Sequence, residues 1–290
     1  MPAADVRIDI RLVQDLLAEQ HPDLVGLAIS PLATGWDNVS FRLGDRFVVR
    51  LPRRAESAAV IAHEQRWLPM LAPRLPLPVP VPIRIGTSID RYPYRWSVCP
   101  WYPGESAADT PPTDLRDAAA KLGAFVGALA TIEVPLDAPL NPWRGIPLME
   151  RDARTRDAIA VIPERWREAA LAAWEGAVAL PEHAGPPRWL HGDLHPANTV
   201  VDGGRLIAVI DFTDLCVGDP ATDLMSAWML LPTEHHATFR EAAGADDESL
   251  WRRGRGWALT HAVATLSNSA DNPLMRQMSE ATLTRVLPEA

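Results

Sequence analysis

The sequence predicts an α+β fold of two lobes, a small N-terminal lobe with an antiparallel sheet and a larger helical C-terminal lobe. Before residue 100, short β-type runs alternate with turns, whereas after residue 114 most segments show helical periodicity. Residues 99–104 contain two prolines and a glycine and separate the two patterns. We therefore expect one lobe over residues 1–100 and the other over residues 101–290.

Two helices and five short strands are expected in the N-terminal lobe. Residues 6–20 form an amphipathic pattern with leucines on one face, and residues 56–71 form a second helical pattern. Gly44-Asp45 predicts a tight turn, and residues 75–82 are too rich in proline for regular structure. The expected strands are residues 27–32, 39–43, 46–51, 83–87 and 94–98.

The C-terminal lobe is expected to be helical except for one segment. Residues 191–198 form a polar loop, and two short apolar runs at 199–201 and 206–210 follow it. Asp202-Gly203-Gly204 joins these runs and predicts a hairpin turn. The expected helices are residues 114–132, 150–161, 164–179, 221–231, 234–243, 247–266 and 273–287.

Composition and charge indicate a globular cytoplasmic protein. The chain has 290 residues, 47% of them hydrophobic, and a net charge of −9, which argues against nucleic acid or an anionic membrane as a partner. No apolar run approaches the length of a membrane span, and the charged first twenty residues do not resemble a secretory signal. Cys99 and Cys216 are far apart and outside any CxxC pattern, so we expect buried free thiols.

The strongest chemical signal lies in residues 191–212. Asp193 precedes Asn198 by five residues, and Asp211 follows the predicted hairpin, which is the spacing of a kinase catalytic loop and its metal-binding carboxylate. Phosphoryl transfer requires a hydroxyl held in line and metal ions that neutralise the phosphate oxygens. One carboxylate can orient the hydroxyl, while a second carboxylate and an amide oxygen can hold Mg²⁺.

This segment resembles that of the aminoglycoside phosphotransferase family, small-molecule kinases with a protein-kinase-like fold. The resemblance implies that Asp193 is the catalytic carboxylate and that Asn198 and Asp211 bind Mg²⁺. It also implies that ATP or GTP lies in the cleft between the lobes. Asp219 and Asp223 match the segment that follows the metal-binding residue, and we expect them to anchor the loop.

The resemblance extends to the N-terminal lobe with weaker motifs. The turn from Gly35 to Asn38 lies where the family covers the nucleotide phosphates, although it lacks the GxGxxG pattern. Arg50 ends the third predicted strand, where kinases place a phosphate-contacting lysine, and the only lysine, Lys121, lies in the other lobe. An arginine can contact phosphate through two nitrogens, and Glu64 is its expected partner.

Two further expectations concern the remainder of this lobe. Cys99 and Trp101 lie at the interlobe hinge, where the resemblance implies recognition of adenine by backbone groups. Arg53 and Arg54 are expected to face solvent, so Arg50 is preferred over them as the phosphate ligand.

Two other classes of protein share parts of this pattern. His191, Asp193 and His195 are spaced as ligands of a metal-dependent hydrolase, but no second cluster supplies further ligands, and His261 is isolated in the sequence. A binding or scaffold protein with this fold would be expected to lack Asp193, Asn198 or Asp211. All three are present, so the kinase interpretation is preferred.

The acceptor is expected to be a small, cationic molecule that bears a hydroxyl. The resemblance implies an aminoglycoside or related antibiotic, and the alternative is a metabolite kinase that acts on a sugar, an amino alcohol or an amino acid. Carboxylates in the C-terminal lobe can pair with substrate ammonium groups, or they can simply solvate helix faces. These acidic residues are Asp214, Glu234, Asp246, Asp247, Glu248, Asp271 and Glu280.

Overall fold

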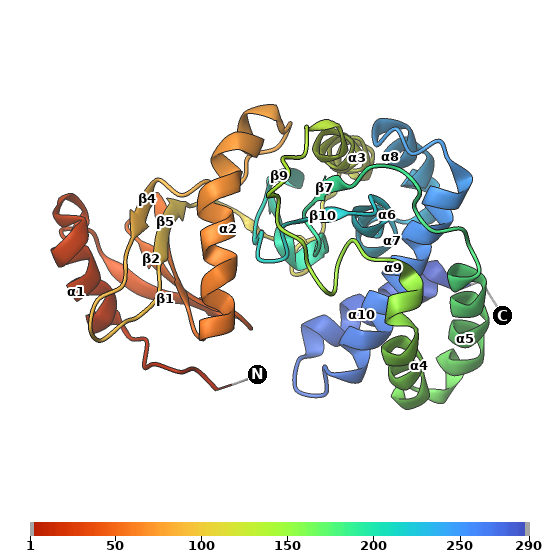
Figure 1. Cartoon of the computed structure of the whole chain (residues 1–290), viewed down its shortest axis with the longest axis horizontal. Coiled ribbons are helices and arrows are strands. Elements are labelled where there is room, and N and C mark those ends of the chain that lie inside the picture. Colours follow the sequence, from red (N-terminus) through yellow and green to blue (C-terminus); the bar gives the residue numbers. More distant parts are fainter. Residues whose placement is uncertain (1–2, 288–290) are drawn as a thin grey trace. The chain divides into compact units, whose positions relative to one another are not determined.

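The computed structural model describes residues 3–287, which divide into two compact units (Figure 1). The N-terminal unit comprises residues 3–73, Pro78–Pro103 and the short segment Ile210–Thr213. The C-terminal unit comprises Arg74–Leu77, Gly104–Val209 and residues 214–287. The predicted α+β class is confirmed. Among the described residues, no helix combines the length and the apolar character that crossing a membrane requires.

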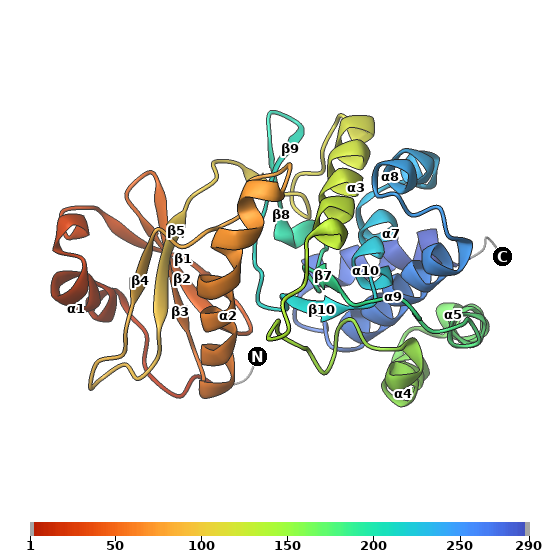
Figure 2. The same ribbon diagram turned by 45° about the horizontal axis from the view of Figure 1, so that its top comes forward.

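The N-terminal unit is a five-stranded antiparallel sheet with one helix on each face. Figure 2 shows α1 (Ile10–Gln20) and α2 (Ala55–Leu71) on opposite sides of the sheet. Gly44 has a φ of 55° in the turn between two strands, as the predicted turn requires. In spatial order the strands are β1 (Ile29–Thr34), β2 (Asn38–Leu43), β3 (Phe47–Pro52), β5 (Trp96–Pro100) and β4 (Arg84–Gly86).

Side-chain alternation along β3 gives its two faces different roles. Val49 and Leu51 join the buried core beneath α1, where Leu16 and Leu17 are fully buried. Arg50 lies between them in the sequence and therefore points to the opposite face, where α2 lies. Helix α1 begins at Ile10, later than predicted, because the Asp9 side chain accepts a hydrogen bond from the backbone of Leu12 and caps the helix.

The C-terminal unit is helical around two small sheets. Its long helices are α3 (Leu115–Thr131), α5 (Glu164–Val178), α9 (Glu248–Ser267) and α10 (Pro273–Val286). Shorter helices are α4 (Asp152–Val161), α6 (Ala221–Leu224), α7 (Ser226–Leu230) and α8 (His236–Ala242). Strands β6 (Glu105–Ser106), β8 (Thr199–Asp202) and β9 (Arg205–Val209) form one sheet, and β7 (Arg188–Leu190) pairs with β10 (Cys216–Gly218) in the other.

The hairpin turn and the two cysteines follow the predictions from the sequence. The predicted hairpin between β8 and β9 is present, with Gly203 at φ 54° and Gly204 at φ 76°. Cys99 and Cys216 are buried free thiols, as predicted.

Short 3₁₀ turns connect several of the helices and strands. They are η1 (Pro22–Leu24), η2 (Ala72–Arg74), η3 (Leu148–Arg151), η4 (Pro196–Asn198) and η5 (Thr233–His235).

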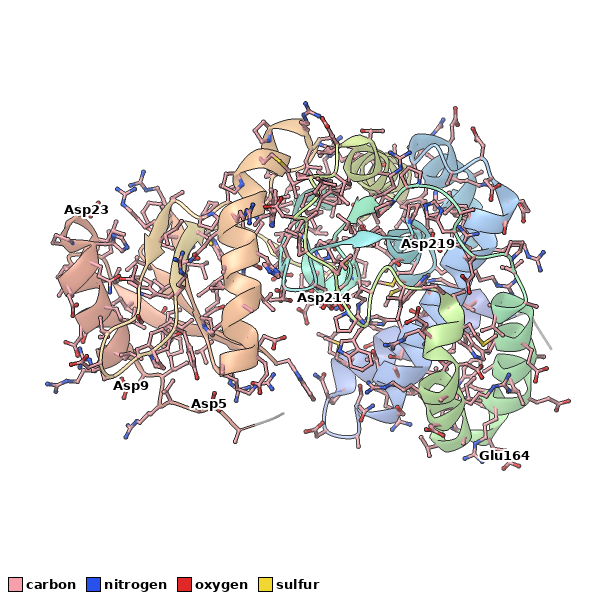
Figure 3. All side chains as sticks on the ribbon, in the orientation of Figure 1. Asp5, Asp9, Asp23, Glu164, Asp214 and Asp219 are labelled. Carbon is pink, nitrogen blue, oxygen red and sulfur yellow. The ribbon has the colours of Figure 1, made fainter. Side chains whose placement is uncertain are left out.

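A buried ion pair holds helix α9 to the chain that directly follows β10. Arg253 Nε lies 2.8 Å from Asp219 Oδ2, and Arg253 Nη2 lies 3.2 Å from Asp219 Oδ1. Asp219, labelled in Figure 3, also accepts a hydrogen bond from the backbone of Ala221 at the start of α6. Both charged side chains are therefore paired in a place that water scarcely reaches.

Loss of one partner should be strongly destabilising, because the other charge would remain buried without compensation. We predict that Arg253→Ala lowers the free energy of unfolding by about 3–5 kcal/mol, measured by urea denaturation. The matched control is Arg252→Ala, since Arg252 is exposed on the same helix and should change stability by less than about 0.5 kcal/mol. Equal stability losses in the two variants would contradict this account of the ion pair.

Candidate active site

The loop that carries Asp193 is fixed by a buried carboxylate. Asp223, on α6, accepts hydrogen bonds from the backbone nitrogens of His191 at 2.7 Å and Gly192 at 2.9 Å. The His191 ring is fully buried, and its Nδ1 accepts a hydrogen bond from the Asp193 backbone nitrogen at 3.2 Å. These three contacts leave the loop little freedom, which confirms the prediction that Asp223 anchors it.

Gly192 is required by the local geometry of the loop. Its φ of 84° lies in the left-handed region, and a Cβ at this position would come within 2.4 Å of the Asp214 carbonyl oxygen. An arginine occupies the corresponding position in the H-R-D motif of protein kinases. No side chain can be placed here without movement of the backbone that carries Asp193 or Asp214.

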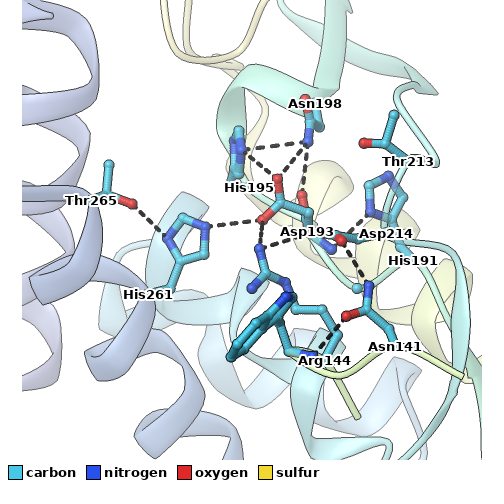
Figure 4. Close-up of polar contacts among 12 residues, drawn as sticks. Asn141, Arg144, His191, Asp193, His195, Asn198, Thr213, Asp214, His261 and Thr265 are labelled. Carbon is cyan, nitrogen blue, oxygen red and sulfur yellow. Dashed lines mark hydrogen bonds and ion pairs between the residues drawn. The ribbon is translucent and has the colours of Figure 1, made fainter. Parts of the chain in front are cut away.

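The Asp193 carboxylate is surrounded by cationic and hydrogen-bonding groups of the same unit (Figure 4). Arg144 Nη2 lies 2.9 Å from Asp193 Oδ1, and His261 Nε2 lies 3.1 Å from the same oxygen. His195 Nε2 lies 3.3 Å from Oδ2. The Asp193 side chain is 22% exposed, so solvent still reaches part of it.

These neighbours keep Asp193 ionised. Burial alone would raise the pKa of this carboxyl group, but His195 and Arg144 outweigh burial and hold the pKa well below its ordinary value. Burial lowers the pKa of His261, which favours the neutral imidazole. A proton on Nε2 allows His261 to donate to Asp193, while its Nδ1 accepts from Thr265 Oγ1 at 3.4 Å.

Asn198 uses its amide nitrogen within the loop. Nδ2 donates to the Asp193 carbonyl oxygen at 2.9 Å and lies 3.4 Å from His195 Nε2. Within the described chain, no hydrogen bond occupies the amide oxygen of Asn198. This orientation leaves an oxygen available to a cation, as the predicted magnesium ligand requires.

In the N-terminal unit, Arg50 forms the pair with Glu64 that the sequence predicted. Arg50 Nη1 lies 2.6 Å from Glu64 Oε2, and its Nη2 lies 3.1 Å from Asp211 Oδ1. Burial opposes the charge on Arg50, but Glu64 and Asp211 raise its pKa above the ordinary value. Arg50 is therefore a permanent cation on β3 with two carboxylate partners.

Asp211 adopts an unusual backbone conformation. Its φ is 61°, and among the described residues it is the one non-glycine residue with a positive φ. Arg50 and Thr213 Oγ1 both contact Oδ1, the latter at 3.0 Å. Oδ2 has no hydrogen bond to the described part of the chain, and the side chain is 43% exposed. Such strain is typical of positions where a side chain must be aimed at a ligand.

The turn between β1 and β2 is tied to the start of α2. The Gly35 backbone nitrogen donates to the Asn38 carbonyl oxygen at 2.9 Å, and Arg53 Nη1 donates to the Gly35 carbonyl oxygen at 3.0 Å. The prediction that Arg53 and Arg54 face solvent is wrong. Arg53 is 8% exposed because it supports this turn, and Arg54 contacts Asp37 at 3.2 Å.

Cys99 and Trp101 lie at the end of β5. Cys99 pairs with Val48 in the sheet, and burial raises the pKa of its thiol to about 12. The Trp101 backbone nitrogen donates to the Arg46 carbonyl oxygen at 2.7 Å. That nitrogen is therefore already used, and a nucleotide contact by Trp101 would involve its carbonyl oxygen.

Sequence reasoning missed two residues of the site, Arg144 and His261. The prediction that His261 is isolated is wrong, because α9 brings it within hydrogen-bond distance of Asp193. Asp193, His195 and His261 could together present three metal-ligand atoms. However, the Arg144 guanidinium already contacts the oxygen that His261 contacts, so a divalent cation there would face a like charge.

A small antiparallel-sheet unit and a helical unit with this catalytic-loop pattern define a kinase-like fold. The chain belongs to the phosphotransferase enzyme family, whose sequence model matches residues 28–257. No curated protein sequence matches the chain.

Solved structures with the same fold cover nearly the whole chain. The GDP and kanamycin complex of APH(2")-IIia has 19% identity and a TM-score of 0.74, and the match covers 94% of this chain and 98% of that one. The GDP complex of aminoglycoside 2'-phosphotransferase-IIIa has 18% identity and a TM-score of 0.75, with 96% and 99% covered. Macrolide 2'-phosphotransferase MphH from Brachybacterium faecium has 24% identity and a TM-score of 0.61, with 97% and 99% covered.

The loop geometry generates a prediction about Gly192. Gly192→Ala should lower the free energy of unfolding by roughly 2–4 kcal/mol, because it adds both a strained φ and a backbone clash. Gly203→Ala is the matched control, since Gly203 also has a positive φ but a Cβ there meets no atom within 4 Å. We expect a loss of about 1–2 kcal/mol for the control in urea denaturation. Equal losses would show that the contact with Asp214 is unimportant.

Proposed function

We propose that this protein transfers the γ-phosphoryl group of ATP or GTP to a hydroxyl group of a small molecule. The observation that carries the proposal is the partly exposed Asp193 carboxylate, fixed on a hydrogen-bonded loop and contacted by Arg144, His195 and His261. Membership of the phosphotransferase enzyme family supports the reaction class.

In the proposed reaction, Asp193 orients the acceptor hydroxyl. Its carboxylate accepts a hydrogen bond from the hydroxyl and takes the proton as the oxygen–phosphorus bond forms. The bond between the γ-phosphorus and the bridging oxygen of the nucleotide breaks, and the diphosphate leaves. Arg144 and His261 hold the carboxylate in one orientation, since both contact the same oxygen.

Asn198 and Asp211 are the proposed magnesium ligands. Each offers one oxygen that no described residue occupies, and carboxylate and amide oxygens suit this hard cation. The two residues belong to different units, and it is their spacing in the sequence that associates them with one site. When bound, Mg²⁺ would neutralise charge on the nucleotide phosphates.

Residues of the N-terminal unit are proposed to bind the nucleotide. Arg50 would contact phosphate, with Glu64 holding its guanidinium in place. The turn from Gly35 to Asn38 would cover the phosphates, and backbone groups at Cys99 and Trp101 would contact the base. Structurally similar proteins bind GDP or ATP, which supports either nucleotide for this chain.

Two acceptor classes are proposed. Complexes with kanamycin, streptomycin and gentamicin among similar structures support an aminoglycoside or related antibiotic. A metabolite kinase acting on a sugar, an amino alcohol or an amino acid is the second candidate. Asp214 is already paired with Arg144 and Asn141, so this acid is not free to bind a substrate ammonium group in either class.

Asp193→Asn tests the role of the carboxylate. The variant keeps the size of the side chain and removes its charge, so we predict a loss of roughly a hundredfold or more in turnover with unchanged nucleotide affinity. The measurement is acceptor-dependent ADP or GDP release, together with nucleotide binding by calorimetry. Asp202→Asn, in the exposed hairpin turn, is the control and should retain full activity. Near-normal turnover in Asp193→Asn would exclude the proposed mechanism.

Asp211→Ala tests the metal site. Removal of the carboxylate should weaken binding of Mg·ATP by roughly tenfold or more and nearly abolish turnover, while binding of metal-free ATP changes far less. The control is Asp45→Ala, in the exposed turn between β2 and β3. If the magnesium dependence of Asp211→Ala matched that of the wild-type protein, Asp211 would not be a ligand.

A further inference from the structure

Three arginines form a cluster beside the Asp193 site in the C-terminal unit. We call Arg144, Arg151 and Arg154 the arginine cluster. Arg144 connects this cluster to the site, since its Nη2 lies 2.9 Å from both Asp193 Oδ1 and Asp214 Oδ2. Arg154 is exposed, and its guanidinium lies 3.8 Å from the centre of the Trp143 ring.

Arg151 differs from its neighbours because it is buried without a partner. It ends the turn η3 and is only 8% exposed. Its Nε is buried and lacks a hydrogen-bond partner, and within residues 3–287 its guanidinium makes no ion pair or hydrogen bond. A buried, unpaired charge destabilises a folded protein by several kcal/mol in general, so such groups are rare without a functional reason.

The surroundings of Arg151 are themselves electropositive. Burial, followed by the charges of Arg144 and Arg154, lowers the pKa of Arg151 to about 10, which still leaves it charged at neutral pH. The charge of Asp214 acts in the opposite direction and raises the pKa of Arg151, but Arg144 and Asn141 already occupy the Asp214 oxygens. Two guanidinium groups and one carboxylate therefore act on Arg151, and its own positive charge stays uncompensated.

Another buried arginine of the same unit, Arg253, shows what a structural role looks like. It binds both oxygens of Asp219 and the Pro181 carbonyl oxygen. Arg151 has no such acceptor in the described chain, so its guanidinium is available to the oxyanion of a bound ligand.

We propose that Arg151 binds an oxyanion, a carboxylate or a phosphate group, on the acceptor whose hydroxyl is phosphorylated at Asp193. This inference rests on the proposed function and narrows it to acceptors such as hydroxy acids, hydroxy amino acids and sugar phosphates. A guanidinium group can bind either oxyanion through two parallel hydrogen bonds. Arg144 places the oxyanion subsite next to the catalytic carboxylate, while Arg154 adds positive charge at the exposed side.

Oxyanion binding can be tested without turnover. The melting temperature is measured with sodium phosphate, sodium acetate or sodium chloride at equal ionic strength, always with saturating Mg·ADP so that nucleotide phosphate sites are filled. We expect phosphate, acetate or both to raise the melting temperature of the wild-type protein by about 3 °C over chloride. The anion that acts identifies the group as phosphate or carboxylate.

Variants assign this effect to Arg151. Arg151→Gln should abolish the anion effect and should itself melt higher than the wild-type protein in chloride, because a buried unpaired charge has been removed. Arg151→Lys should retain part of the effect. Arg165→Gln, which removes an exposed arginine on α5, should respond to the anions like the wild-type protein. An absence of any anion effect in the wild-type protein, or an equal effect in Arg151→Gln, would overturn the proposal.

Matched acceptors provide the second test. ADP release is compared for a sugar, its sugar acid and its sugar phosphate, and for a hydroxy amino acid and its carboxamide. The wild-type protein should prefer the anionic member by at least about tenfold in kcat/KM, and Arg151→Gln should lose that preference with its KM for ATP unchanged. Equal turnover of kanamycin or a neutral sugar by both proteins would overturn the oxyanion subsite and leave the phosphotransfer function intact. Anion binding at Arg151 without turnover of any hydroxyl compound would support the subsite and overturn the phosphotransfer function.

Discussion

The negative charge of Asp193 is the constraint on which the C-terminal site depends. A partly buried carboxylate is stable in its ionised form only when compensating groups surround it, and Arg144, His195 and His261 supply this compensation. They come from three separate parts of the chain, so the site exists only when the unit is folded. Asp223 adds the second requirement, because it holds the backbone of His191 and Gly192, directly before Asp193.

Stability and function make opposing demands at several positions. Asp211 adopts a left-handed conformation, and Arg151 is a buried charge without a partner. Either feature would be unfavourable in a protein selected for stability alone, and both involve residues with proposed ligand contacts. By contrast, Arg253 and Asp219 are fully paired, which fits a structural role. Pairing therefore distinguishes Arg253 from Arg151, two buried arginines of the same unit.

The sequence predicted most of the fold because its signals are local. Strand alternation, helical periodicity and the glycine turns at Gly44 and Gly203 depend on neighbouring residues. The spacing of Asp193, Asn198 and Asp211 was also readable, since one short loop and a hairpin join them. His261 and Arg144 were missed because tertiary packing alone brings them to Asp193, and no spacing rule links them to it. Arg53 was misjudged for the same reason, since its partner is a carbonyl oxygen of a distant turn.

The presence of two histidines beside Asp193 defines the decisive measurement. Either imidazole could serve as the proton acceptor in place of the carboxylate. The pH dependence of single-turnover phosphoryl transfer, measured from pH 5 to 8 with saturating Mg·ATP and acceptor, separates these roles. Because the pKa of Asp193 lies well below its ordinary value, the account predicts a flat profile over this range. Burial lowers the pKa of His261, so a base at this position would produce an inflection below the ordinary histidine value of about 6.5. Such an inflection, if it disappears in His261→Asn, would contradict the account and assign the base to His261.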